Sequence, residues 1–434
     1  MKPLSVKHKD TKNTKITRRA YRAALCSLSL SVSISCFGTE LTSYEDFLRI
    51  AKENNAGVQA AYNRWQAELS KADMVKALPD PKLTYSYFIE SVETRTGPQE
   101  QKAGISQQFP WFGKLDAKQK AQLAHADNAY EQYRSALLKL AFGVRRTYAE
   151  SWLLQREMEL TRQHIQLLEN IEGVAESRVR AGASASEVIK TRLERAQLEE
   201  RLQTLDQKQV PLNTQLNAAL NRNARTPIPP ITMLDARSLN RAGMELLSLE
   251  NNPGLIALQH GQTGAEADIR AAKKTGLPDI TLGVEWIGIG DASSPVKDSG
   301  KDAWMAGIGI SLPLWRGKYN ADVVRASYMR NAYDLARQQK SNTLESELES
   351  AIADYHEAER KVALYRDTIL PQSDQLLELN ETDYRSGKAS FLDLIDTQRS
   401  ILRYQLDLAR ARADSQIHLA KIELLIGKEL DDEN

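Results

Sequence analysis

One pair of side chains in this 434-residue sequence has a spacing that would present two acids on the same face of a helix. Asp393 and Asp396 closely follow Gly387, which interrupts a long helix-forming stretch. Residues three positions apart lie on one face of an α-helix. The two carboxylates would therefore be presented together and would favour cations. The simpler interpretation of such a pair is an ordinary solvated helix face.

The sequence lacks the residue patterns of catalysis and of resident cofactors. Its six histidines are scattered, and no HExxH, GxSxG or phosphate-binding loop is present. Both cysteines, Cys26 and Cys36, lie near the start of the chain. A formal net charge of +1 gives no basic footprint for nucleic acid. We therefore expect neither an enzyme nor a metal, cofactor or nucleic-acid site.

Residues 1–38 have the composition of a secretory signal peptide. Lys and Arg dominate residues 1–22, and a run of apolar and small residues follows, from Ala23 to Gly38. A disordered basic tail is the alternative interpretation. Cys36 is a candidate lipidation site, although the serine three positions before it fits a lipidation motif poorly.

The rest of the chain contains an internal duplication. The elements that recur at offsets of 199 to 205 residues are Leu78-Pro79-Asp80 with Leu277-Pro278-Asp279, Pro110 with Pro313, and Gly182 with Gly387. A repeat of about 200 residues is too long for a solenoid unit, so two copies of one large module are expected.

Composition and period predict two long helices and several shorter ones. Ser43 is a candidate N-cap, with Asp46 at the capping-box position. The expected helices run over Tyr44–Lys76, Lys114–Arg180, about Glu187–Leu220, about Met244–Lys274, Lys318–Arg385 and about Phe391–Ile426. Two short helices stacked end to end would match each long one, and Pro371 should kink the second long helix.

Two hairpins of alternating apolar and polar residues are expected, at 82–109 and 279–312. Their loops should be Thr94–Gln101 and Asp291–Asp302. Each hairpin ends at a proline, Pro110 or Pro313, and Trp111 and Trp315 stand at the junctions of strand and helix. The expected organisation is a signal peptide at 1–38, a first repeat at 39–222, a linker at 223–242, a second repeat at 243–428 and an acidic tail at 429–434.

The strands decide how such a chain could cross a membrane. No run of 18 apolar residues exists, which leaves a closed β-barrel. Four strands cannot close one, so several chains must contribute. The aromatic residues Tyr85, Tyr87, Trp286 and Trp304 suit a lipid-facing side, and glycine, serine and threonine suit a solvated lumen. Ordinary core packing is the alternative for the aromatics.

The motifs PDPKLTYSYF, QFPWFGK, LPDITLGVEW, ISLPLWRGK and YRSGKASFLDLIDTQRSIL together resemble the TolC-like outer-membrane efflux proteins of Gram-negative bacteria. The resemblance covers about residues 42–428, and LPDP with QFPWFGK is similar to the heavy-metal efflux branch. It implies a mixed α+β membrane protein in which a homotrimer, four strands per chain, forms a transmembrane β-barrel in outer-membrane lipid. A long α-helical coiled-coil barrel would extend into the periplasm.

The resemblance also implies partners and a gate. The partners would be a periplasmic adaptor and an inner-membrane pump of the resistance-nodulation-division type. The tips of the helical hairpins, at Gly182 and Gly387, would form the gate. Asp393 and Asp396 would line it and Tyr384 would latch it. Glu187 would add a further acid only if the turn after Gly182 were one residue shorter.

A different class of protein remains as the alternative. A periplasmic coiled-coil scaffold or adaptor without a membrane barrel would account for the helices. It would leave the four alternating strands and their flanking prolines unexplained.

Overall fold

The structure is a computed structural model, and it describes residues 41–430 except 183, 235–243, 387 and 389. The expected signal peptide at 1–38 lies outside the described residues, as do Cys36, Gly387, part of the expected linker and the end of the acidic tail. All described residues belong to one compact unit.

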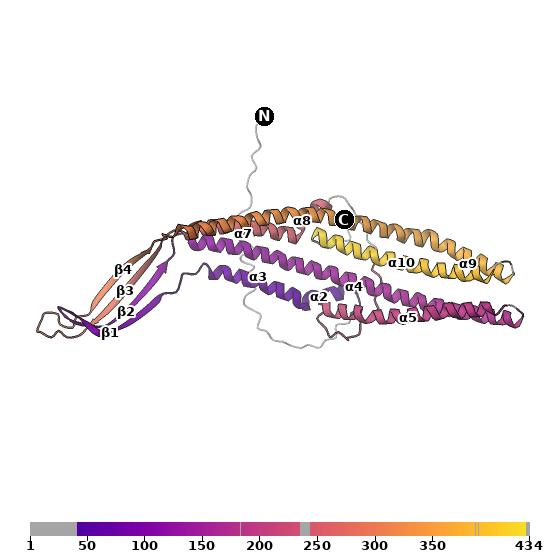
Figure 1. The fold of residues 1–434 in the computed structure, drawn as a ribbon, viewed down its shortest axis with the longest axis horizontal. Coiled ribbons are helices and arrows are strands. Elements are labelled where there is room, and N and C mark those ends of the chain that lie inside the picture. Colours follow the sequence, from indigo (N-terminus) through magenta and orange to yellow (C-terminus); the bar gives the residue numbers. More distant parts are fainter. Residues whose placement is uncertain (1–40, 183, 235–243, 387, 389, 431–434) are drawn as a thin grey trace, which may run out of the picture. The chain divides into compact units, whose positions relative to one another are not determined.

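The first half of the chain follows the plan helix, hairpin, long helix, return helix, and the second half repeats it (Figure 1). The elements of the first half are α2 (Tyr44–Asn54), α3 (Ala56–Met74), β1 (Lys82–Thr94), β2 (Gly97–Phe109), α4 (Lys114–Arg180) and α5 (Ser186–Ala219). Those of the second half are α6 (Met244–Asn251), α7 (Pro253–Thr275), β3 (Asp279–Ile289), β4 (Ala303–Ser311), α8 (Arg316–Leu364), the π-helical turn η2 (Tyr365–Ile369), α9 (Leu370–Arg385) and α10 (Phe391–Ile426).

The helix expected to open each half is in fact two helices. Ser43 caps α2 through the expected capping box with Asp46. Asn55 then turns to an extended ψ of 118°, and its side chain accepts the N–H groups of Gly57 and Val58 to start α3. Asn252 does the same between α6 and α7. The prediction of one continuous helix was wrong because an asparagine can cap a new helix without interrupting the apolar pattern.

The first hairpin is longer than expected. Thr94–Gln101 was predicted as a loop, but only residues 95–96 form the turn. The cause lies in the second hairpin, whose loop donates two backbone hydrogen bonds here, from Gly290 N to Pro98 O and from Gly300 N to Thr96 O. These bonds hold residues 96–98 beside the loop that follows β3. Because they join residues far apart in the sequence, local turn residues do not predict them.

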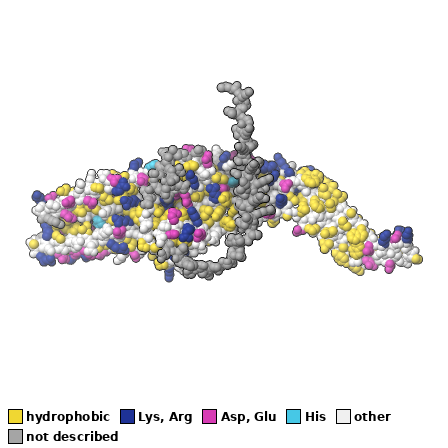
Figure 2. Space-filling model, turned by 180° about the vertical axis from the view of Figure 1, so that it is seen from behind, with side chains coloured by type: hydrophobic (Ala, Val, Ile, Leu, Met, Phe, Trp, Pro, Cys, Tyr) yellow, Lys and Arg dark blue, Asp and Glu magenta, His cyan; other side chains and the backbone are white. Residues whose placement is uncertain are grey.

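The four strands form one antiparallel sheet in the order β1-β2-β3-β4, so β1 and β4 are its edges. Cross-strand partners lie on the same face of a sheet. One row, Tyr85, Ala103, Trp286 and Trp304, is apolar, and the next, Thr84, Gly104, Glu285 and Met305, lies on the opposite, more polar face. Figure 2 shows hydrophobic side chains gathered over the sheet and charged side chains at its far end.

The helices pack as a coiled coil of long and short members. α3 and α5 follow α4, and α7 and α10 follow α8, which confirms the expected stacking of short helices beside each long one (Figure 1). α4 also packs against α7 and α10, which joins the two halves. In the described part of the chain, no helix is both long and apolar enough to cross a membrane.

The second long helix is interrupted where the proline predicts it. η2 ends just before Pro371, and the N–H of Leu370 bonds to the carbonyl of Tyr365, five residues back. The helix predicted as Lys318–Arg385 is therefore three segments, α8, η2 and α9. α4, which has no proline at the matching place, runs unbroken over 67 residues.

A candidate constriction at the helical tips

The start of α10 positions the first of the two candidate acids. Ser390 is the N-cap, its Oγ accepts the N–H of Asp393 at 3.2 Å, and it donates to the Asp393 carboxylate at 2.8 Å. The Ser390 N–H also donates to this carboxylate, at 3.1 Å. Asp393 therefore completes a capping box, which fixes the start of α10 and orients the carboxylate.

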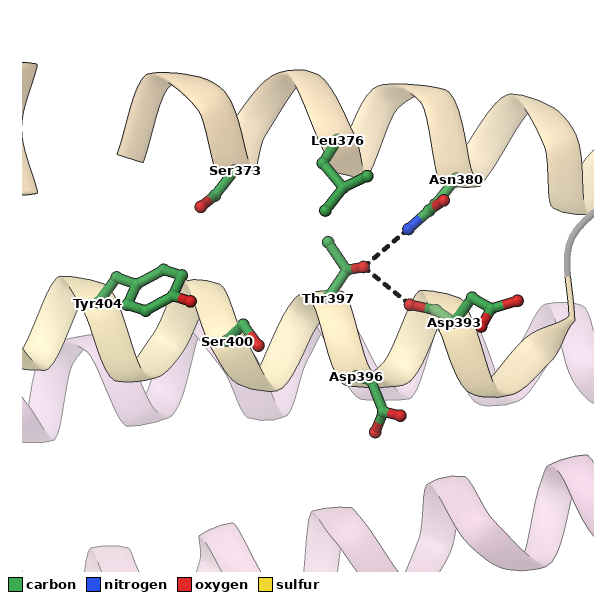
Figure 3. Close-up of a pocket in the computed structure, with 8 residues that line it drawn as sticks. All are labelled: Ser373, Leu376, Asn380, Asp393, Asp396, Thr397, Ser400 and Tyr404. Atoms are coloured by element: carbon green, nitrogen blue, oxygen red, sulfur yellow. Dashed lines mark hydrogen bonds between the residues drawn. The ribbon is translucent and has the colours of Figure 1, made fainter. Parts of the chain in front are cut away.

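Asp396 has a different environment from Asp393. Its side chain is 67% exposed and accepts a hydrogen bond from Arg399 at 3.2 Å. Arg399 also bonds to Glu194 on α5, whose side chain is only 12% exposed. In Figure 3 the Asp396 carboxylate points away from α9. One guanidinium thus joins Asp396 to the return helix of the other half.

A polar groove of about 390 Å³ separates α9 from α10 beside these acids. Asn380 on α9 donates to the hydroxyl of Thr397 on α10 at 2.7 Å, and that hydroxyl donates to the Asp393 carbonyl at 2.8 Å (Figure 3). The two helices of this hairpin are therefore tied together by a side-chain bond six residues after the start of α10.

Tyr384 joins the two helical hairpins, α4–α5 and α9–α10. Its ring is buried, and its hydroxyl donates to Glu187 Oε2 at 2.9 Å. The Arg178 guanidinium lies 4.3 Å from the ring centroid. Burial first, and then the Glu187 carboxylate, raise the pKa of the Tyr384 phenol above its usual range. The phenol therefore stays protonated and keeps donating.

Glu187 lies against Tyr384, near the start of α5. Thr191 Oγ1 donates to the Glu187 carbonyl at 3.0 Å, as Thr397 Oγ1 donates to the Asp393 carbonyl at 2.8 Å. That Glu187 adds an acid to the constriction stays a prediction. Gly182 itself has φ of +100°, a conformation that glycine adopts without strain.

The junctions of strand and helix contain an interaction that sequence reasoning missed. Lys114 Nζ lies 2.7 Å from Asp279 Oδ1 and donates to the Leu277 carbonyl at 2.8 Å. The N–H of Trp111 donates to the same Asp279 oxygen at 3.0 Å. Pro110 precedes this cluster. At the other junction, Trp315 is 82% exposed. The signal that could have found the cluster is that Lys114 and Asp279 both lie in repeated motifs.

Among the described residues, no group of three or more His, Cys, Asp or Glu side chains could hold a metal ion. The candidate site is a set of acids, hydroxyls and one shared guanidinium at the helical tips.

Comparison with protein families matches the model described as "Outer membrane efflux protein" to residues 47–222 and 246–428. The chain belongs to the outer membrane efflux protein family. As a member of this family it is an outer-membrane efflux channel of the TolC-like kind, not an enzyme. The two matched stretches are its two repeats.

Two relatives that are named for different exported substances have the same sequence identity to this chain. Pyoverdine export outer membrane protein OpmQ of Pseudomonas putida is 24% identical over 325 residues, which cover 70% of this chain and 65% of that protein. Cation efflux system protein CusC of Escherichia coli is 24% identical over 307 residues, which cover 67% of this chain and 60% of that protein. The aligned region thus spans less than two thirds of either relative.

Solved structures share the fold. A crystal structure of CusC matches with a TM-score of 0.76 at 17% identity, over 89% of this chain and 92% of that one. The outer membrane protein VceC of Vibrio cholerae matches with a TM-score of 0.72 at 17% identity, over 89% and 97% of the two chains.

Proposed function

We propose that the protein is the exit duct of a tripartite efflux system and conducts small molecules or metal ions passively to the exterior. A periplasmic adaptor and an inner-membrane pump of the resistance-nodulation-division type would deliver the cargo. The observation that carries the proposal is the sheet's exposed apolar face, on which Tyr85 is 65% and Ile308 is 70% exposed. An apolar surface of this kind, attached to long polar helices, fits insertion in lipid.

The working unit in this proposal is a homotrimer. The edges β1 and β4 present unpaired backbone groups, which are costly in lipid and are satisfied when neighbouring copies pair. Cross-linking of detergent-extracted protein should give trimers. A monodisperse monomer with intact β content would contradict this assembly.

The constriction in this proposal is formed by Asp393 and Asp396, six carboxylates in a trimer. Tyr384 and Glu187 form the latch that holds the two hairpins together. The support is that both acids are exposed near the hairpin tip and that the Tyr384–Glu187 bond crosses between the hairpins. A ring of carboxylates lowers the energy of cations in a narrow passage.

The test is conduction through single channels in planar bilayers. Replacing both Asp393 and Asp396 by alanine should raise conductance and weaken cation selectivity and block by polyvalent cations. Asp396→Ala alone should shift conductance and selectivity in the same direction by a smaller amount, and it separates the loss of charge from the loss of the cap because it leaves the Ser390–Asp393 capping box intact. Unchanged conductance, selectivity and block in an assembled double variant would rule out the constriction.

A further inference from the structure

The two halves of the sheet meet at β2 and β3, and an ion pair closes this seam at its helical end. Lys114 Nζ and Asp279 Oδ1 are 2.7 Å apart, and the two side chains are only 8% and 20% exposed. The N–H of Trp111 and the amide of Gln108 also donate to the Asp279 carboxylate. We call the pair Lys114–Asp279 the junction lock.

Both members of the junction lock have a counterpart in the other repeat. Asp279 ends Leu-Pro-Asp at 277–279, and Asp80 ends the same tripeptide at 78–80. Lys114 follows Gly113 after β2, and Lys318 follows Gly317 after β4. The chain therefore carries a second aspartate and a second lysine at the positions that build the lock.

The second pair does not meet within one chain. Asp80 precedes β1 and Lys318 follows β4, which are opposite edges of the sheet. Both side chains are exposed and border the open cavity at the junction of sheet and helices. Over the described residues no ion pair involves Asp80 or Lys318. The lock is complete at the internal seam and divided between the two edges.

We propose that, where β4 of one copy pairs with β1 of the next in the assembly described above, Lys318 bonds to Asp80 of that copy and the strands keep the register of the internal seam. The inference rests on the oligomeric assembly proposed above and assigns its contacts. The occupant of each edge is a second copy of this chain, because the opposite charges at the two edges are those of the internal lock.

The internal seam also gives the register between copies. Ile105 pairs with Val284, and Gln107 pairs with Leu282. The repeat offsets of 203 for β2 to β4 and 199 for β3 to β1 convert these pairs into Ile308 with Tyr85 and Ile310 with Leu83 of the next copy. These four counterparts are all exposed and apolar.

The register keeps the faces of the sheet continuous. Tyr85 and Ile308 both lie on the apolar face, so the pairing extends that face across the boundary between copies. A shift by one residue would place Ile308 opposite Thr84 or Ser86, and would move the whole apolar set of one strand to the polar face.

Disulfide trapping in the full chain tests the register. The double variant Tyr85→Cys with Ile308→Cys should give covalently linked oligomers on oxidation, whereas each single variant should not. The single variants also control for Cys26 and Cys36. The shifted pair Tyr85→Cys with Ile310→Cys should link poorly, because diagonal neighbours are about 7–8 Å apart, beyond the usual Cα separation of a disulfide. Preferential linking of the shifted pair would overturn the register.

A charge swap tests the lock itself. Asp80→Lys and Lys318→Asp should each lower the temperature at which the trimer dissociates in detergent, and the double swap should restore it. Asp73→Lys is the matched control, since Asp73 is an exposed acid on α3 outside the lock. If the double swap is no more stable than the single variants, the Asp80–Lys318 pair does not exist.

The outcome separates this inference from the proposed function. If the wild-type protein is a trimer but the double variant Tyr85→Cys with Ile308→Cys fails to link, the inference is overturned and the duct proposal stands. A monomeric wild-type protein would overturn both.

Discussion

Arg399 stands between two carboxylates that belong to different hairpins. It bonds to Asp396 in the proposed constriction and to Glu194 across the seam of the two return helices. The guanidinium therefore offsets part of the negative charge that the acids present. Glu194, being nearly buried, holds Arg399 in place.

We expect Arg399→Gln and Glu194→Gln to shift selectivity in opposite directions. The first removes three positive charges from a trimer and should raise the cation-to-anion permeability ratio by roughly two- to fourfold at about 0.1 M salt. The second removes negative charge and leaves Arg399 to Asp396, so the ratio should fall. Reversal potentials measure both. If both variants shift the permeability ratio in the same direction, Arg399 only holds the helices together and does not set the charge of the constriction. Arg403→Gln, one turn away on the same helix, is the control.

Tyr384→Phe should shift the proposed constriction toward its open state, in which the two helical hairpins are no longer held together. The substitution removes the hydroxyl that donates to Glu187 and keeps the ring that packs on Phe391 and under Arg178. Losing a hydrogen bond to a charged group costs about 1.5–3 kcal/mol, which is roughly a 10- to 150-fold change in the closed-to-open ratio. The open probability of single channels reports it. If the variant channel is closed as often as the parent channel, the Tyr384–Glu187 bond does not stabilise the closed state.

At the scale of the helix, the two halves of the chain are joined by a histidine–aspartate pair between α4 and α7, and the charge of the histidine depends on pH. His125 Nε2 on α4 lies 2.9 Å from Asp268 Oδ2 on α7. The hydrogen bond to Asp268 raises the pKa of His125 above 6.5, against the opposing effect of burial. The protonated form is therefore favoured in the folded state. Its stabilising contribution is fully present below pH 6.5 and is lost as the pH rises through the higher, folded-state pKa.

The expected result is that His125→Gln destabilises the protein more at pH 6 than at pH 8.5, by up to about 1 kcal/mol for a partly exposed pair. His164→Gln is an informative control because the pKa of His164 is shifted in the opposite direction, so its effect on stability has the opposite pH dependence. Burial lowers the pKa of His164, so its neutral form is favoured and stability is lost as the pH falls through its folded-state pKa. Thermal unfolding at the two pH values measures both. Equal losses for His125→Gln at both would contradict the ion pair.

The long helices were predictable, and their interruptions were only partly so. The bounds Lys114–Arg180 agree with the structure because helix-forming residues run without a proline up to the glycine at the tip. The breaks at Asn55 and Asn252 were missed, since each is made by one side chain capping backbone that still follows the apolar period. The extended first hairpin was missed because its strand ends are held by the loop of the second hairpin.

The acids of the candidate site could be found from the sequence, but their partners could not. Asp393 and Asp396 stand out by spacing after Gly387. The Arg399–Glu194 bond joins residues 205 positions apart, and the junction lock joins residues 165 apart. Such pairs depend on how the repeats pack, which local patterns do not encode.

For the whole molecule, the proposed duct fixes which end faces outside the cell. The loop between β3 and β4 lies at the end of the sheet away from the helices (Figure 1). Ser293 in this loop is exposed, as is Ser184 at the helical tip. A cysteine at Ser293 should react with an impermeant thiol reagent on intact cells.

A cysteine at Ser184 is the matched control and should react only after the outer membrane is opened. Labelling with the reverse pattern would invert the orientation. Labelling of both positions on intact cells would contradict a protein that separates two compartments.

The π turn at Tyr365–Ile369 bears on the history of the chain. Gly113 and Gly317, before the long helices, are 204 positions apart, whereas Arg180 and Arg385, at their ends, are 205 apart. The two copies of the long helix have thus diverged in length by one codon. In a continuous α-helix one extra residue would rotate everything beyond it by about 100°. The π turn accommodates one extra residue locally, so the helix beyond it does not take up that rotation. Beyond the tips, Arg399 of the second copy bonds to Glu194 of the first, 205 positions away.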